Sequence, residues 1–206
     1  MPRPSPGVPP WSPRTAALAL VLTASGALAG CQSATGPQTA PDRLSRDDGG
    51  VTLASHGIET KTRIHRVYGR LPDVRRKEVR TEVGRVVDRW WDAAYLGGDY
   101  PRSSFPSAFP GFTAGAEQRA RDDKALLTNQ TQGASIDSVT AKHRTVTLDI
   151  LATDRQARSV TAHVLLRFET TGDRAGTTTV RGRLFLTRQG RSWRIFGYDV
   201  AKGAQR

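Results

Sequence analysis

The stretch DVRRKEVRTEVGRVVDRWWDAAYLGG, residues 73–98, determines the fold that this chain is expected to adopt. Its apolar residues recur at spacings of three and four, which places them on one stripe of an α-helix. They are Val79, Val83, Val86, Val87, Trp90 and Ala94. Gly97 and Gly98 follow as stop signals. The opposite face mixes acids and bases, whereas a helix lying on a membrane carries Lys and Arg almost alone. We therefore expect this helix to cover a protein core.

The sequence after this helix predicts a second helix and then a sheet. SSFPSAFPGF, residues 103–112, spaces three phenylalanines among prolines, and a helix is expected from Thr113, its N-cap, to Leu127. Beyond Gly133, apolar and polar residues alternate in four segments, near 146–150, 160–168, 180–187 and 193–200. Residues 58–71 fit either a short strand or a lead-in to the first helix. The order predicts an α+β fold, in which a curved antiparallel sheet packs on the N-terminal helices.

The single cysteine, Cys31, lies at the end of a short apolar run. Arg3 and Arg14 provide a positive start, and residues 15–29 are too few to span a bilayer, which needs about 20 apolar residues. Leu28-Ala29-Gly30-Cys31 resembles the lipobox of bacterial lipoproteins. The resemblance implies that the Cys31 thiol receives a diacylglyceryl group and that the chain is cut after Gly30. The alternatives are a secreted protein without lipid and a cytosolic protein with an incidental cysteine.

The chain is therefore divided into three parts. Residues 1–30 are predicted to be a lipoprotein signal peptide, and residues 31–57, rich in Ser, Thr, Gly, Pro and Asp, a flexible tether. Residues 58–206 are predicted to form a single α+β domain with its core at about 72–202. The mature protein is expected on the extracytoplasmic face of the cell membrane, held by its lipid anchor.

A formal net charge of +12 and an isoelectric point near 10.9 would ordinarily suggest nucleic-acid binding. Export argues against a nucleic-acid partner, and the excess of Arg over Lys is what a GC-rich genome would give. Attraction to an anionic lipid surface, or to anionic wall polymers, is the expected consequence of the charge.

The closing segment GRLFLTRQGRSWRIFGYDV, residues 182–200, together with the order of elements before it, resembles the nuclear transport factor 2-like superfamily. The resemblance is to its exported actinobacterial branch, found in lipoproteins and in proteins associated with mammalian-cell-entry transport systems. It implies a cone-like, cystatin-like arrangement of helices and sheet. In that superfamily the open end of the cone holds a small molecule, serves as a dimer surface or has no chemical role.

An acid–base enzyme of this fold would need a carboxylate or histidine buried in the cone. The strand candidates are Asp149, His163, Tyr198 and Asp199, and none matches a catalytic position of the resembling cyclases and isomerases. Asp149 and His163 occupy the polar phases of their strands, so we expect both outside the cone. The four histidines lack zinc-site spacing, and there is neither a phosphate loop nor a GxSxG elbow. No catalytic residue, metal or cofactor is predicted.

A cluster of aromatic residues is the remaining candidate site. A pocket or partner surface is predicted to consist of Trp91, Tyr95, Phe105, Phe109 and Phe112. The alternative, which we favour, is that these rings form the core beneath the helices. Trp90 lies within the apolar stripe and is expected to be buried, whereas Trp91 lies on its edge and is expected to be partly exposed.

These observations predict a membrane-anchored lipoprotein that acts as a non-catalytic binding or assembly module at the cell envelope. Its expected partners are membrane lipid, through Cys31, and a protein of an envelope or transport complex. The alternative is a small-molecule-binding protein or acid–base enzyme of the cyclase or isomerase type. The lining of the cone distinguishes the binding module from the enzyme, because catalysis requires a buried Asp or His there.

Overall fold

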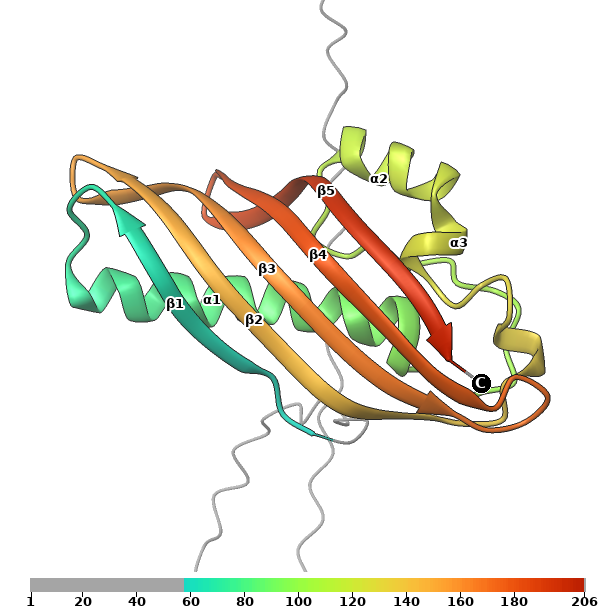
Figure 1. Ribbon diagram of the computed structural model, residues 1–206. Coiled ribbons are helices and arrows are strands. Elements are labelled where there is room, and N and C mark those ends of the chain that lie inside the picture. The colour runs from blue at the N-terminus through green and yellow to red at the C-terminus, as the bar shows by residue number, and fades with distance from the viewer. Residues whose placement is uncertain (1–57, 206) are drawn as a thin grey trace, which may run out of the picture. The chain divides into compact units, whose positions relative to one another are not determined.

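A five-stranded sheet forms the frame of the fold (Figure 1). The computed structural model describes residues 58–205, so the signal peptide, Cys31 and the tether lie outside the described residues. The sheet order is β1-β2-β3-β4-β5. The strands are β1 (Lys61–Tyr68), β2 (Val139–Thr153), β3 (Gln156–Thr170), β4 (Gly176–Gln189) and β5 (Ser192–Gln205).

Strands β2 to β5 form the predicted antiparallel meander. The ambiguous segment 58–71 contains β1, which pairs with β2 in parallel, with Lys61 opposite Thr145. The sheet is therefore mixed, and the expectation of an entirely antiparallel sheet is corrected at this one edge. The core also begins before residue 72, because Ile64 and Val67 of β1 pack against it. The predicted α+β class, with a curved open sheet, is confirmed.

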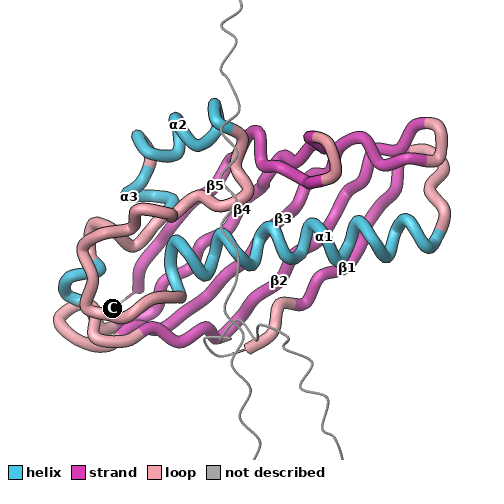
Figure 2. Tube along the Cα trace, turned by 180° about the vertical axis from the view of Figure 1, so that it is seen from behind, coloured by secondary structure: helices cyan, strands magenta, loops and turns pink. Residues whose placement is uncertain are grey.

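Helix α1 (Asp73–Trp91) crosses one face of the sheet (Figure 2). It continues into η1 (Asp92–Leu96), a π-helical turn in which the Gly97 N–H donates to the Asp92 carbonyl at 2.7 Å. Gly98 then takes a φ of +83°, a conformation that favours glycine. The helix thus ends at the predicted glycine pair.

Three short helices follow, and α2 and α3 lie near β5 (Figure 1). They are α2 (Ala114–Asp122), α3 (Lys124–Leu127) and η2 (Gly133–Ser135). The side chain of Thr113 accepts a hydrogen bond from the Ala116 N–H at 3.3 Å, which confirms the predicted N-cap. The single helix expected from Thr113 to Leu127 is divided at Asp123, because α2 ends at Asp122 and α3 begins at Lys124.

The core lies between α1 and the concave face of the sheet. Strand side chains alternate between this face and the opposite face, as in Val146, Leu148 and Ile150, all fully buried. Bulges in the β1–β2, β2–β3 and β4–β5 pairings add local twist. At Gly182 a Cβ would lie 2.1 Å from the Asp199 carbonyl oxygen, so the chain approaches β5 where only glycine fits.

A buried ion-pair cluster joins α1 to β2. Arg144 of β2 is 4% exposed and donates to Asp88 at 3.0 Å and to Asp92 at 3.1 Å. Thr60, just before β1, also donates to Asp88. The cluster therefore ties the edge strand, the second strand and the helix together through Asp88.

Candidate functional site

The interior of the predicted cone is filled by aromatic and aliphatic side chains. Trp90 contacts Tyr95 with ring centroids 5.7 Å apart and Phe112 at 6.1 Å, and Tyr95 contacts Phe168 of β3 at 5.9 Å. Trp90, Tyr95 and Phe168 are fully buried, and Phe112 is 5% exposed. The space where a cyclase-like enzyme would hold a catalytic group is therefore occupied by the core.

The prediction that Trp91 is partly exposed is wrong, because its side chain is fully buried. The sheet curves around α1, so the buried arc of the helix is wider than the valine stripe and also includes Gly84. The guanidinium of Arg144 lies 5.7 Å from the Trp91 ring centroid and covers the side that a flat sheet would leave open. The prediction that Trp90 is buried is confirmed.

Tyr95 is held by hydrogen bonds that have a structural role. Its hydroxyl donates to the Leu126 carbonyl at 2.8 Å, and its own carbonyl accepts from the Tyr100 hydroxyl at 2.6 Å and from Asn129 at 3.1 Å. Burial raises the pKa of Tyr95 well above its ordinary value. The side chain thus stays neutral and holds the end of the long helix against α3.

Phe105 and Phe109 reach a surface hollow. Both line a volume of about 240 Å³, with the charged side chains of Arg121 and Lys124 on the same wall. Arg102 stacks on Phe105 at 3.7 Å from the ring centroid. All five predicted residues belong to the core, as the favoured alternative expects, and two of them, Phe105 and Phe109, also line this hollow.

The predicted position of Asp149 and His163 on the outer face of the sheet is confirmed. His163 Nε2 lies 3.0 Å from one oxygen of Asp149, and His65 Nδ1 lies 2.8 Å from the other. Partial burial acts to raise the pKa of Asp149, but hydrogen bonds and charge interactions with the two histidines hold it below the ordinary value. Sequence analysis missed His65, because the β-bulge between Ile64 and Arg66 that turns it toward Asp149 has no sequence signal here.

Tyr198 and Asp199 have separate partners. The Tyr198 hydroxyl donates to Asp123 at 2.7 Å, and burial together with this carboxylate raises the pKa of Tyr198 to about 12. Asp199 pairs with Arg183 on the exposed face of the sheet. The four strand candidates therefore do not converge on one site. Within residues 58–205, no group of three or more His, Cys, Asp or Glu side chains could hold a metal ion.

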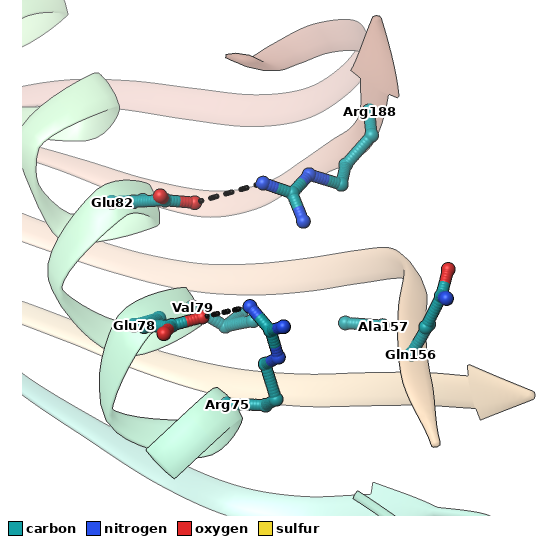
Figure 3. A pocket seen from close by; sticks show the side chains of 7 residues that line it. All are labelled: Arg75, Glu78, Val79, Glu82, Gln156, Ala157 and Arg188. Carbon is teal, nitrogen blue, oxygen red and sulfur yellow. Dashed lines mark hydrogen bonds and ion pairs between the residues drawn. The ribbon is translucent and has the colours of Figure 1, made fainter. Parts of the chain in front are cut away.

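Two hollows follow the exposed side of α1, and we call them together the α1 groove. The first, of about 210 Å³, is drawn in Figure 3; its lining is Arg75, Glu78, Val79, Glu82, Gln156, Ala157 and Arg188. The second has about 190 Å³, and its lining is Glu82, Arg85, Val86, Arg89, Arg191, Ser192 and Trp193.

The two hollows of the α1 groove have different charge. Arg75 pairs with Glu78 at 2.8 Å and Arg188 with Glu82 at 3.6 Å, so the first hollow is balanced (Figure 3). The second hollow adds three arginines, from α1 and from the turn between β4 and β5. Sequence analysis did not identify this groove, because nothing in the local pattern places that turn beside α1.

A fourth hollow, of about 520 Å³, lies over β3, β4 and β5 and includes Arg167, Arg181 and Lys202 in its lining. The Lys202 amine donates to the Thr128 carbonyl at 2.7 Å. Burial lowers the pKa of Lys202 to about 8.

The chain has no match among protein-family models, curated proteins or solved structures. No helix within residues 58–205 is both long enough and apolar enough to cross a membrane.

Proposed function

We propose that this protein is an exported, lipid-anchored binding or assembly module of the bacterial cell envelope, with a nuclear transport factor 2-like domain. The observation that carries the proposal is the filled interior, where Trp90, Trp91 and Tyr95 are fully buried between α1 and the sheet. A domain with this interior meets its partners on its surface. A helix on the concave face of a curved sheet also supports the proposed superfamily.

The same observation favours a module over an acid–base enzyme of the cyclase or isomerase type. Such an enzyme needs a carboxylate or imidazole desolvated in a cavity, where burial shifts its pKa toward the working pH. Asp149 and His163 lie on the opposite face of the sheet, and the pKa of Asp149 is lowered rather than raised.

Attachment to the membrane through Cys31 is the second part of the proposal. The lipobox-like tetrapeptide Leu28-Ala29-Gly30-Cys31 supports it, as does the apolar run before it. Two or more acyl chains anchor a protein stably. The basic charge of the chain adds attraction to an anionic leaflet, at about 1 kcal/mol for each well-placed Lys or Arg.

Metabolic labelling with palmitate tests the anchor. The full-length chain expressed in a bacterial host should incorporate label and sediment with membranes, and Cys31→Ser should lose the label. Ser33→Ala, two residues away, is a matched control that should keep it. Label retained in Cys31→Ser would contradict the assignment.

Crosslinking of the native lipoprotein in membranes, followed by affinity recovery, tests the module. A specific protein partner recovered with the wild type, and in the same amount with Asp149→Asn, is the expected result. Turnover of a small molecule that is abolished by Asp149→Asn or His163→Ala would favour the enzyme instead.

A further inference from the structure

Three arginines converge on the second hollow of the α1 groove. Arg85 and Arg89 lie one turn apart on the exposed side of α1, and Arg191 comes from the turn between β4 and β5. Arg191 is more than 100 residues from both helix arginines in sequence, so only the fold brings the turn to the helix. We call these three residues the arginine cluster.

The arginine cluster has no internal counter-ion. None of its three side chains has a hydrogen-bond or ion-pair partner within the part of the chain that the structure describes. The one carboxylate that lines this hollow, Glu82, is paired with Arg188 at 3.6 Å. The second hollow therefore carries an excess positive charge that an anion from solution would neutralise.

The walls of the hollow suit a small, compact anion. A volume of about 190 Å³ is well above the roughly 10–15 Å³ of probe-occupied space needed for one water molecule. Ser192 lines it and can donate a hydroxyl hydrogen bond. Trp193, 2% exposed, forms an apolar wall, and Arg188 lies over its ring at 5.6 Å from the centroid. Val86 adds to the same apolar wall.

We propose that the arginine cluster binds a phosphoryl group, as free phosphate, a soluble phosphate ester or a phosphomonoester lipid headgroup. A guanidinium binds oxyanions through a planar fork of N–H donors. A carboxylate has two oxygens and satisfies one or two such forks, whereas a phosphoryl group offers three non-bridging oxygens, one for each arginine. The inference goes beyond the proposed function and holds whether or not Cys31 carries lipid.

Calorimetric titration of the full-length Cys31→Ser chain with inorganic phosphate, at low ionic strength, tests the site without the acyl anchor. The double variant Arg85→Ala/Arg89→Ala should bind phosphate at least about tenfold more weakly, because it loses two of the three guanidinium groups that donate charged hydrogen bonds to the anion. Lys77→Ala/Arg80→Ala is the matched control: it removes the same two charges from exposed positions of α1 outside the groove, and should bind within about twofold of the parent. Thermal midpoints of all variants should agree within a few degrees.

A second arm identifies the source of the phosphoryl group. The same variants are mixed with phosphatidylcholine vesicles with and without phosphatidic acid. Binding to free phosphate that the double variant loses supports a soluble ligand. Binding only to vesicles with phosphatidic acid, again lost in the double variant, supports a headgroup. Absence of binding in both arms, or equal weakening by Lys77→Ala/Arg80→Ala and by Arg85→Ala/Arg89→Ala, would overturn the proposal.

Discussion

Trp90 and Trp91 are adjacent in sequence and both fully buried, and neither indole N–H has a hydrogen-bond partner among residues 58–205. A buried N–H without an acceptor costs about 1–3 kcal/mol. Burial of a large aromatic surface offsets that cost, and Trp90 also makes edge-to-face contacts with Tyr95 and Phe112. These two tryptophans therefore stabilise the domain through the apolar surface that they bury and not through hydrogen bonds of their indole N–H groups.

Replacement of either tryptophan by alanine should destabilise the domain strongly. Each truncation leaves a large cavity, so we expect Trp90→Ala and Trp91→Ala each to lower the free energy of unfolding by about 3–5 kcal/mol. Urea denaturation followed by circular dichroism measures the loss. Val74→Ala, at a position 67% exposed on the same helix, should change it by less than about 0.5 kcal/mol. An unchanged free energy of unfolding in Trp91→Ala would contradict the burial of this side chain.

Lys202 should make the stability depend on pH. Burial lowers its pKa to about 8 from 10.5, so the unfolded chain binds more protons than the folded chain between these values. The free energy of unfolding should therefore rise as pH increases from 8 toward 10. Lys202→Met should flatten that rise, as denaturant midpoints at several pH values would reveal. Measurements stay below about pH 10, where tyrosines begin to ionise. If the free energy of unfolding changed with pH in the same way in the wild type and in Lys202→Met, the lowered pKa of Lys202 would be contradicted.

At the scale of elements, the contact between α1 and β2 depends on Arg144. Its guanidinium is buried and is shared between Asp88 and Asp92, one turn apart on α1 and η1. The removal of one partner of a buried pair leaves the other charges desolvated without compensation. The pairing therefore fixes how the helix is placed along the strand.

Arg144→Met should lower the free energy of unfolding by about 3 kcal/mol, the low end of the range for a broken buried pair, because both carboxylates keep some contact with solvent. Arg158→Met is the control, since its 3.5 Å pair with Asp154 is exposed, and it should cost less than about 1 kcal/mol. Chemical denaturation of both variants provides the comparison. Equal losses would mean that the cluster contributes no more than a surface ion pair.

On the scale of the whole molecule, the folded unit should begin at β1. Limited trypsin digestion of the full-length chain should cut the predicted tether at Arg43 and Arg46 and leave Arg63 intact, because Arg63 lies in a paired strand. Mass spectrometry of the resistant fragment gives its first residue. A fragment that begins after Arg70 would show that β1 detaches. Survival of the bonds after Arg43 and Arg46 would contradict the tether.

Local patterns predicted most of the fold. Spacings of three and four gave α1, the glycine pair gave its end, and alternation gave the four strands of the meander. The parallel pairing of β1 could not be predicted, because it joins segments 84 residues apart. The burial of Trp91 could not be predicted either, because it depends on how far the sheet curves around α1. The arginine cluster was missed because Arg191 lies in the turn between β4 and β5 and shares a hollow with Arg89 only once the sheet has packed on α1.

The edge position of β1 also bears on the order in which the sheet folds. Arg63 pairs with Thr147, 84 residues later, whereas each strand of the meander meets the next one within a short turn. Closing so large a loop costs more entropy than closing a hairpin. We therefore expect the meander to form first and β1 to dock on it afterwards.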